Sequence, residues 1–283
     1  MSFWAQAQEQ AGLAKQKGAL FPLETTERAH EDQGYPFRLL TIGAMSEPQL
    51  AALIQAFASP TCPFCPPLDP NLALGKTRTG HQVILNKFPV LESHLLAISS
   101  QHEDQENYLG PEDFAAAAEV LGEEDGLIFF NAGRHAGASQ PHKHVQIVRT
   151  GQLPLNAWLA RGPSGRHRLP YRHALAPLDA VAFQEGAAGP VLFATYARLL
   201  TESGVATTTV QPGIIQEAPY NLLLTRQWMI IVPRTTERAA MDIPINALGF
   251  AGIILLRDAS QEQLVCSQGA LSLLAATGFA PSP

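Results

Sequence analysis

Cysteine is scarce in this chain of 283 residues, which contains only three. An odd number of cysteines argues against a disulfide framework, and a reducing compartment would keep them as thiols. No stretch approaches the roughly 20 apolar residues that span a bilayer. The first residues also lack the basic start, apolar segment and cleavage site of a signal peptide. We therefore expect a soluble, cytoplasmic protein that does not contact membranes.

Charge is also limited, because charged residues make up 16% of the chain and the formal net charge is −6. This balance argues against a general nucleic-acid binder, whose affinity for phosphate requires a basic face. Any polyanionic ligand must therefore be held by local positive charge. With 46% hydrophobic residues, the chain can bury a substantial core, as one large domain or as a main domain with a smaller appendage.

The first half of the chain alternates between strand and helix patterns. Apolar alternation predicts strands at 81–89, 94–100, 126–131 and 144–149. Between them, Pro111 opens an alanine-rich helix that extends to about Leu121. Earlier, Ser46-Glu47-Pro48-Gln49 has the form of a capping box, and the apolar residues that follow predict a core-facing helix, namely Leu50, Leu53, Ile54 and Phe57. This order favours an α+β fold with helices packed on an antiparallel sheet.

The second half is less regular at its start. Residues 153–189 lack clear periodicity and are rich in proline and glycine, which predicts a surface excursion or mobile loop. One of its arginines, within 161–168, could reach a phosphate. A helix is expected over 190–203, followed by strands within 221–234, an apolar run at 250–256 and a helix from about Ser260 that buries Cys266 as a small core residue. We expect residues 1–150 to form a core, 151–215 an excursion with a helix, and 216–283 a C-terminal extension, within one compact unit.

The most informative stretch is 137–148, where a small-residue loop runs into a strand with polar groups at every second position. His142, His144 and Gln146 share one face of an extended chain, roughly 6.5 to 7 Å apart, while Val145 and Ile147 face the other side. The simpler interpretation is a pair of surface histidines on an edge strand. The preceding glycines favour a functional site instead, since glycine-rich turns expose backbone N–H groups that can hold phosphate.

This stretch resembles the H-x-H-x-Q signature of the histidine-triad superfamily in its transferase form. The longer strings are similar to the diadenosine tetraphosphate phosphorylase family, also called ATP adenylyltransferase. The resemblance covers nearly the whole chain. It is carried by Leu85–Val90, Ser93–Leu96, Asn131–Gly133, Gly137–Gln146, Pro219–Thr225, Trp228–Met229, Val232–Arg234 and Asn246–Gly252.

The resemblance implies a histidine-triad-like antiparallel sheet and a two-step transfer. In that scheme His144 attacks the α-phosphorus of the dinucleotide, forms an adenylyl-histidine and expels ATP. Inorganic phosphate then attacks the intermediate and gives ADP. Gln146 can donate to a phosphoryl oxygen but cannot act as an acid or base, so we expect it to favour phosphorolysis over hydrolysis.

The charge that develops on the transferred group needs donors fixed in advance. The candidates are the amides of the loop 137–140, the Ser139 hydroxyl as a catalytic group, Asn131, and the cations Lys87 and Arg234. By resemblance, the set that contacts the dinucleotide is Asn86, Lys87, Asn131, Gly137, Ala138, Ser139, Gln140, Gln146, Asn221, Met229 and Arg234. Lys143 points to the opposite face of the strand and is expected at the surface.

A second constellation combines the pair Cys62 and Cys65 with His102 and His142. A C-x-x-C knuckle and two histidines provide the four ligands that tetrahedral zinc prefers. The simpler interpretation is two buried thiols in a proline-rich turn. A similar arrangement occurs in galactose-1-phosphate uridylyltransferase and in zinc-bearing histidine-triad proteins, which favours structural zinc. The phosphorylase family does not generally carry the knuckle, so this is a departure from its pattern.

Two alternatives stay open: another transferase of the superfamily, such as a hexose-1-phosphate uridylyltransferase, and a nucleotide-binding protein without turnover. The strings at 137–146 and 246–252 argue against the first, and the presence of both His144 and Gln146 argues against the second. The sequence leaves open the preferred dinucleotide, the length of its phosphate bridge, a need for magnesium and the oligomeric state.

Overall fold

The computed structural model describes residues 1–59, 61–151, 153–159, 169–184, 186–211 and 214–281. Its helices are α1 Phe3–Gln16, α2 Glu47–Ala58, α3 Pro111–Leu121, α4 Pro154–Leu159, α5 Ala188–Ser203, α6 Ala247–Phe250, α7 Ala259–Gln268 and α8 Ala270–Thr277. Three 3-10 turns are also formed, η1 Arg134–Ala136, η2 Ala180–Phe183 and η3 Ala240–Asp242.

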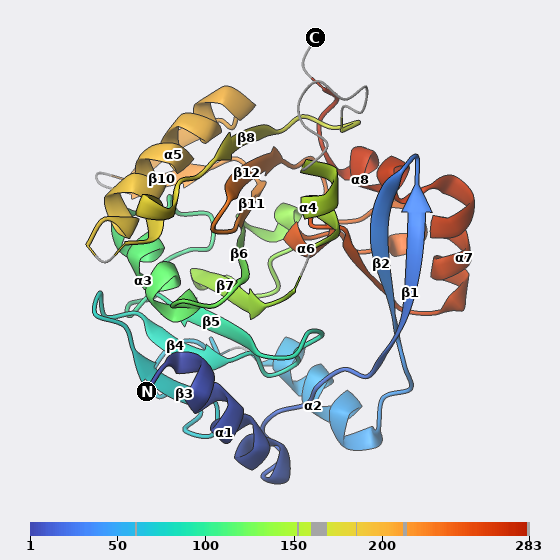
Figure 1. Ribbon diagram of the computed structural model, residues 1–283. Coiled ribbons are helices and arrows are strands. Elements are labelled where there is room, and N and C mark those ends of the chain that lie inside the picture. Colours follow the sequence, from blue (N-terminus) through green and yellow to red (C-terminus); the bar gives the residue numbers. More distant parts are fainter. Residues whose placement is uncertain (60, 152, 160–168, 185, 212–213, 282–283) are drawn as a thin grey trace.

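The strands are organised around one large sheet (Figure 1). They are β1 Thr25–Asp32, β2 Tyr35–Ile42, β3 Ala73–Lys76, β4 Gln82–Leu85, β5 His94–Ile98, β6 Gly126–Asn131, β7 His144–Arg149, β8 Ala174–Pro177, β9 Thr207–Gln211, β10 Ile214–Glu217, β11 Tyr220–Leu224, β12 Trp228–Pro233 and β13 Ile253–Leu256. The eight-stranded sheet has the order β3-β4-β5-β7-β6-β11-β12-β8, and all its pairs are antiparallel. This confirms the predicted α+β class. The three predicted segments, 1–150, 151–215 and 216–283, all contribute strands to this sheet. The division therefore describes successive parts of the chain that share one sheet.

Two buried clusters lie against the large sheet, because successive side chains of a strand point to opposite faces. On β11, Leu222 and Leu224 join one cluster and Leu223 joins the other. The first cluster includes residues of α1, α3 and α5. The second includes residues of β2, β13, α6, α7 and α8, which lie on the other side of the sheet (Figure 1). In the strand order of this sheet, β7 lies between β5 and β6 and is therefore an inner strand.

The predicted helix after Ser46 is present, but it is not core-facing. The Ser46 backbone N–H donates to Gln49 Oε1 at 2.8 Å, as expected for a capping box. Leu50 and Ile54 are nevertheless 48% and 59% exposed. Apolar periodicity identified the apolar face of the helix, but no element among the described residues covers those two side chains.

Most other predicted elements agree closely with the structure. The prediction of a surface excursion over 153–189 is wrong in part, because this segment forms α4 and β8, and β8 pairs with β12 in the large sheet. The predicted strand at 81–89 is shorter, because β4 ends at Leu85. α5 ends at Gly204, whose φ of 72° is the left-handed conformation typical of a helix terminus. Cys266 is half-buried against the second cluster and not fully in the core. The arginines predicted within 161–168 lie outside the described residues. Among the described residues, no helix has the length and apolar character needed to cross a membrane.

Candidate active site and metal centre

The strand β7 carries its polar residues on one face, as the alternation predicts. Val145 and Ile147 pack into the first buried cluster, and His144 and Gln146 point to the opposite face of the strand, where they line a cavity. The backbone of β7 is held by a buried side chain: Gln105 Oε1 accepts from the His144 N–H at 2.9 Å, and its Nε2 donates to the Asn131 carbonyl at 2.9 Å.

The ring of His144 has a defined tautomer. Its Nδ1 lies 2.7 Å from the backbone carbonyl of His142. Because a carbonyl can only accept, Nδ1 carries the proton and Nε2 keeps its lone pair. Burial lowers the pKa of His144 to about 4, so the ring is neutral at neutral pH. A neutral, oriented imidazole is the form that attacks phosphorus.

His144 and Gln146 line a cavity of about 620 Å³. Its polar lining includes four more predicted site residues, Asn86, Lys87, Ser139 and Gln140. The remaining wall is largely apolar and comes mainly from residues 61–72, with further residues of β4, β5 and α2; it includes Pro63, Phe64, Pro67, Leu68, Pro70, Leu72, Ile84, Leu85 and Leu96. The cavity thus joins an apolar surface, on which a base can stack, to a polar end beside His144.

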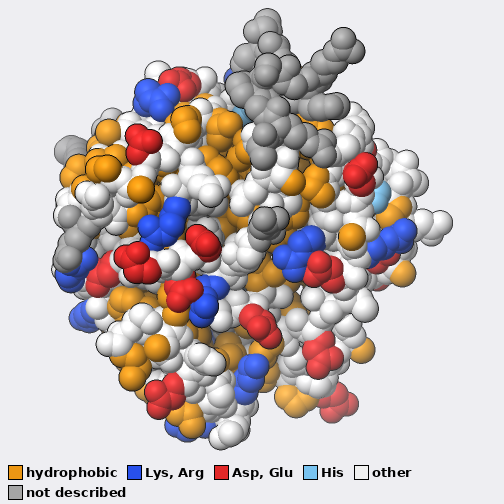
Figure 2. Space-filling view, viewed as in Figure 1, with side chains coloured by type: hydrophobic (Ala, Val, Ile, Leu, Met, Phe, Trp, Pro, Cys, Tyr) orange, Lys and Arg blue, Asp and Glu red, His pale blue; other side chains and the backbone are white. Residues whose placement is uncertain are grey.

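Local positive charge in the cavity comes from Lys87. Its Nζ lies 5.8 Å from the ring centroids of both Phe21 and Phe88. On the molecular face in Figure 2, Lys and Arg side chains are interspersed with Asp and Glu side chains and form no broad basic field. On this face the positive charge is therefore local, in agreement with the overall composition.

The loop before β7 is held against the C-terminal part of the chain. Gly137 has a φ of 90°, and a Cβ there would lie 2.7 Å from the Asn246 Cβ at the start of α6. Only glycine fits this close approach. The amides of Gly137 and Ala138 donate to Arg134 and Gly133 carbonyls within the turn. Neither residue lines the cavity, so the predicted contacts of these two amides with phosphate stay predictions.

Four other predicted contacts are buried and lie outside the cavity lining: Met229 on β12, and Asn131, Asn221 and Arg234 behind this loop. Asn131 Oδ1 accepts from Asn221 Nδ2 at 2.8 Å and from the Ala247 N–H at 3.0 Å. Asn221 also donates to the Ala136 carbonyl at 2.8 Å. The two asparagines thus join β6, β11, the loop and α6, and a direct nucleotide contact by any of the four stays a prediction.

Arg234 is a buried cation, 2% exposed, whose partners are mainly backbone carbonyls. Burial lowers its pKa to about 9, which leaves it charged at neutral pH. The guanidinium also donates to Asn221 Oδ1. Its carbonyl partners are Ala136, Thr236, Ile245 and Thr277. Arg234 therefore ties the loop before β7 to the C-terminal helix α8.

The prediction that Lys143 is a surface residue is wrong. Lys143 is 5% exposed, and its Nζ lies 3.2 Å from Asp113 Oδ2 and 2.5 Å from Glu103 Oε2. Burial alone would lower the pKa of Lys143, but the two carboxylates outweigh it and raise the pKa. The alternation placed this side chain correctly opposite His144, where α3 supplies the carboxylate that compensates its charge.

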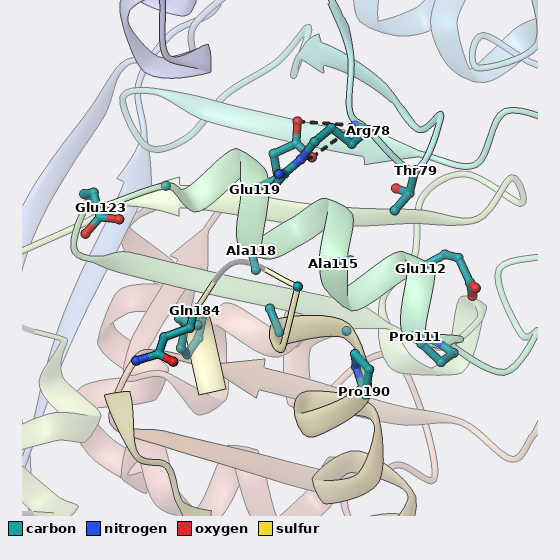
Figure 3. Close-up of a pocket in the computed structure, with 15 residues that line it drawn as sticks. Arg78, Thr79, Pro111, Glu112, Ala115, Ala118, Glu119, Glu123, Gln184 and Pro190 are labelled. Atoms are coloured by element: carbon teal, nitrogen blue, oxygen red, sulfur yellow. Dashed lines mark hydrogen bonds and ion pairs between the residues drawn. The ribbon is translucent and has the colours of Figure 1, made fainter. Parts of the chain in front are cut away.

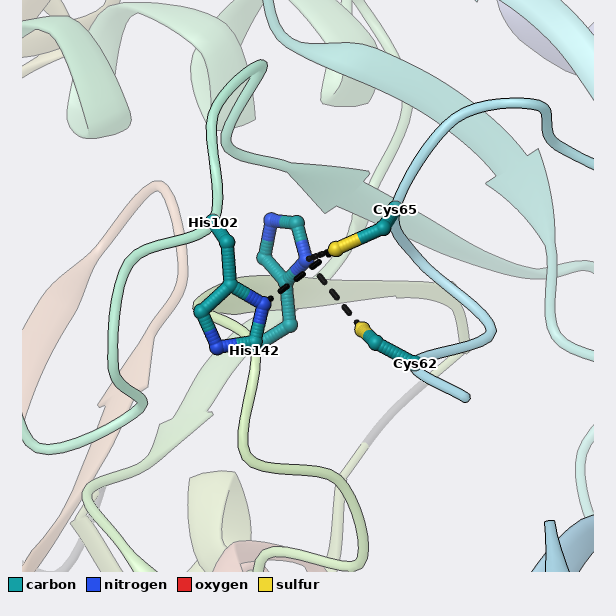
Figure 4. A group of neighbouring side chains, drawn as sticks. All are labelled: Cys62, Cys65, His102 and His142. Carbon is teal, nitrogen blue, oxygen red and sulfur yellow. Dashed lines mark hydrogen bonds between the residues drawn. The ribbon is translucent and has the colours of Figure 1, made fainter. Parts of the chain in front are cut away.

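The four predicted metal ligands come together from three separate segments (Figure 4). Their ligand atoms all lie within 4.8 Å of one another. His142 Nδ1 lies 3.4 Å from Cys62 Sγ and 3.6 Å from Cys65 Sγ, and His102 Nδ1 lies 3.3 Å from Cys65 Sγ. A zinc tetrahedron with arms of about 2.0 to 2.3 Å has edges of about 3.3 to 3.8 Å, so these separations suit zinc.

The outer contacts of this cluster also suit a metal. His142 Nε2 lies 3.0 Å from the Ser99 carbonyl and must donate to it, which leaves Nδ1 directed at the thiols. Phe64, between the two cysteines in sequence, packs edge-on against both His142 and His144, with ring centroids 6.2 and 5.0 Å apart. The knuckle therefore forms part of the cavity wall.

Several residues of the site were not predicted individually. Phe64 and the other apolar residues of the 61–72 wall carry no polar signal of their own, and Gln105 lies in a loop without periodicity. His94 entered only as part of a family-like string. It is buried, and its Nε2 lies 2.9 Å from Gln146 Oε1. A histidine at the start of a buried strand, next to the strand that carries His144 and Gln146, is the signal that could have identified it.

A separate groove of about 460 Å³ lies between α3 and residues 183, 184 and 186–190 (Figure 3). Its charged lining includes Glu112, Glu119, Glu123 and Arg78, and Arg78 Nε is paired with Glu119 Oε2 at 3.2 Å. None of the predicted site residues lines it. Its excess of carboxylates suits a polyphosphate poorly, which leaves the cavity at His144 as the candidate nucleotide site.

Two family models match consecutive parts of the chain. Residues 1–161 match the Ap4A phosphorylase N-terminal domain, and residues 167–280 match the ATP adenylyltransferase C-terminal domain. Among relatives, diadenosine 5',5'''-P1,P4-tetraphosphate phosphorylase 2 of Saccharomyces cerevisiae (strain ATCC 204508 / S288c) is 30% identical over 230 residues, covering 69% of this chain and 69% of that protein. Protein APA1 of the same yeast is 26% identical over 209 residues, covering 65% of this chain and 64% of that protein.

Solved structures match over almost the full length. The crystal structure of yeast Ap4A phosphorylase Apa2 has a TM-score of 0.78 and 23% identity, covering 99% of this chain and 98% of that chain. The structure of Apa2 in complex with Ap4A has a TM-score of 0.75 and 24% identity, with the same coverage. At this level of identity, the structural similarity shows a shared fold.

Proposed function

The chain belongs to the Ap4A phosphorylase (ATP adenylyltransferase) family, and from that premise we propose that it cleaves diadenosine tetraphosphate (Ap4A) by phosphorolysis through an adenylyl group carried on His144. The observation that carries the proposal is the hydrogen bond from His144 Nδ1 to the His142 carbonyl. That bond leaves the Nε2 lone pair for a cavity that His144 lines. The cavity volume, about 620 Å³, suits a nucleotide.

In the first step Nε2 attacks the α-phosphorus. The N–P bond forms as the bond from phosphorus to the bridging oxygen breaks, and ATP leaves with the bonding electron pair. The proton on Nδ1 stays in its bond to the His142 carbonyl and stabilises the positive charge on the ring. In the second step an oxygen of inorganic phosphate attacks the same phosphorus. The N–P bond then breaks, ADP leaves, and His144 is neutral again.

Groups at the polar end of the cavity stabilise the charge that develops on the transferred phosphoryl group. We assign this role to Lys87, the Ser139 hydroxyl and the Gln146 amide, all of which line the cavity. Asn86 and Gln140 complete the polar end. The apolar wall that includes Phe64 holds the base of the transferred nucleotide.

Gln146 selects phosphate over water as the second nucleophile. An amide has no useful acid–base capacity, so it cannot remove a proton from water. Phosphate is already ionised and needs no base. We therefore expect initial rates of Ap4A cleavage to depend on added phosphate, with release of equal amounts of ATP and ADP. Equal rates with and without phosphate would contradict this role.

The covalent intermediate is tested by replacing the nucleophile. We expect His144→Ala to lower turnover by about 10³-fold or more while leaving Ap4A binding largely intact. Wild-type protein incubated with labelled Ap4A without phosphate and then quenched should carry acid-labile adenylate on the peptide that contains His144. The matched control is His135→Ala, an exposed histidine in the preceding loop. Label that persists in His144→Ala would exclude this residue as the carrier.

We also propose that Cys62, Cys65, His102 and His142 hold structural zinc. The support is the ligand set and its separations, all within 4.8 Å. With four protein ligands there is no open position for water or substrate. The ion would supply a fixed charge that pins the knuckle and His142, and so would order the cavity wall at Phe64 and the carbonyl that orients His144.

The zinc proposal is tested by metal analysis of protein purified without added metal. We expect about one equivalent of zinc in the wild type and loss of that zinc in Cys62→Ser. Loss should lower Tm by at least about 5 °C, because the binding energy of a structural metal contributes to folding. Cys266→Ser is the matched control, since Cys266 lies outside the cluster. A metal-free wild type that is fully folded and active would refute the site.

A further inference from the structure

His94 opens β5 and lies behind the cavity. His94 is 6% exposed, and it lies opposite Val148 in the pairing of β5 with β7. Its ring touches two residues that line the cavity: Nε2 lies 2.9 Å from Gln146 Oε1, and Nδ1 lies 3.0 Å from Asn86 Nδ2. His94 is therefore placed to act on the site through these two amides.

The direction of these hydrogen bonds is fixed by one backbone group. The Phe88 N–H donates to Asn86 Oδ1 at 3.1 Å. Since a backbone N–H can only donate, that side of the Asn86 amide is the oxygen and the other side is the NH₂ group. Asn86 Nδ2 consequently donates to His94 Nδ1, which must be the unprotonated nitrogen of the ring.

The tautomer of His94 in turn determines the orientation of the Gln146 amide on β7. A neutral ring unprotonated at Nδ1 carries its proton on Nε2, so His94 donates to Gln146 Oε1. The carbonyl oxygen of Gln146 is then turned toward β5, and its NH₂ group remains for the cavity. In the opposite orientation, Gln146 would present an oxygen to a negatively charged phosphoryl group and repel it.

Burial keeps the His94 ring neutral, which is the form that these hydrogen bonds to Asn86 and Gln146 require. It lowers the pKa of His94 to about 4, although the bond to Gln146 acts in the opposite direction. The Phe129 ring, 5.7 Å away between centroids, covers one side of the imidazole. At neutral pH the ring therefore carries one proton, on Nε2. His94 then accepts a hydrogen bond from Asn86 and donates one to Gln146, and the reverse arrangement is not possible.

We propose that His94 is a positioning residue that turns the NH₂ group of Gln146 toward the transferred phosphoryl group, with its own direction set by Asn86 and the Phe88 amide. This inference rests on the proposed function, because it assumes that Gln146 meets that phosphoryl group. It assigns Asn86 to the orientation of His94, whereas the family resemblance implies only a substrate contact.

The test compares two amide replacements of different length. In His94→Gln, the side-chain nitrogen can reach the place of the imidazole Nε2 and donate to Gln146. In His94→Asn, the shorter amide reaches only the place of Nδ1, so Gln146 loses its fixed direction. We expect His94→Asn to lower kcat for phosphorolysis about tenfold or more, with KM for Ap4A changed less than about threefold. His94→Gln should retain kcat within about fivefold of the wild type.

A double-mutant cycle shows whether His94 acts through Gln146. In a Gln146→Ala background, His94→Asn should have no further effect on kcat, since nothing remains to be oriented. A purely structural role predicts an additional loss in that background. Equal kcat for His94→Asn and wild type, equal losses in His94→Asn and His94→Gln, or additive losses in the cycle would each overturn the proposal.

A measurement on the unaltered protein covers the case in which a variant fails to fold. In ¹⁵N-labelled wild type at neutral pH, NMR should find His94 neutral and protonated on Nε2, and an Nδ1-protonated ring would overturn the proposal. This result does not depend on turnover. If His144→Ala stayed fully active, the proposed function would fail, while the tautomer of His94 and its bond to Gln146 would still be decided.

Discussion

The hydrogen bond from His144 Nδ1 to the His142 carbonyl is the interaction on which the rest of the site depends. It decides which ring nitrogen is protonated, and so which one can attack. It also joins the two histidines, because the carbonyl belongs to the residue whose own ring points into the cysteine cluster. In the proposed mechanism, alternate residues of one extended segment therefore have different tasks: a metal ligand at 142, just before β7, and a nucleophile at 144 and an amide donor at 146 on β7 itself.

This division of tasks requires a fixed register, since a slip of one residue would send every side chain of β7 to the opposite face. The fold secures the register from both sides. Gln105 holds the backbone of His144, and the buried charge of Lys143 is neutralised by Asp113 and Glu103 on the other face. Removing either carboxylate would leave Lys143 poorly compensated in the interior, which is costly. The polar residues around β7 thus help to fix its register.

The sequence predicted the local features that repeat or pair by residue type. Strand alternation placed His144 and Gln146 on one face, and the chemistry of zinc ligands picked out four residues that the fold brings together from three segments. What it could not predict depends on partners distant in sequence. Lys143 was expected at the surface. Its partner Asp113 lies on a helix 30 residues earlier, so the pattern around Lys143 could not reveal the ion pair. Leu50 and Ile54 had the right spacing for a core-facing helix, but the spacing does not say whether another element covers them.

The same limit explains the polar residues of the C-terminal part. Asn131, Asn221 and Arg234 stand in motif-like strings, from which a substrate contact was expected. In the fold they bind one another and the loop before β7. Their sequence signal is that of functional residues, and only the packing shows that they lie behind the loop and outside the cavity. The orientation of Gln146 likewise depends on His94 and a backbone amide, which no pattern of residue types reveals.

The central claim is a double displacement at phosphorus on His144, and its stereochemical course tests it most directly. An Ap4A analogue with sulfur of one configuration at both α-phosphorus atoms would be cleaved in the presence of phosphate, and the configuration of the ADP α-thiophosphate product determined. Two in-line displacements, each with inversion, predict the same spatial arrangement as in the substrate. An inverted product would mean that phosphate attacks the dinucleotide in one step, which would contradict the account.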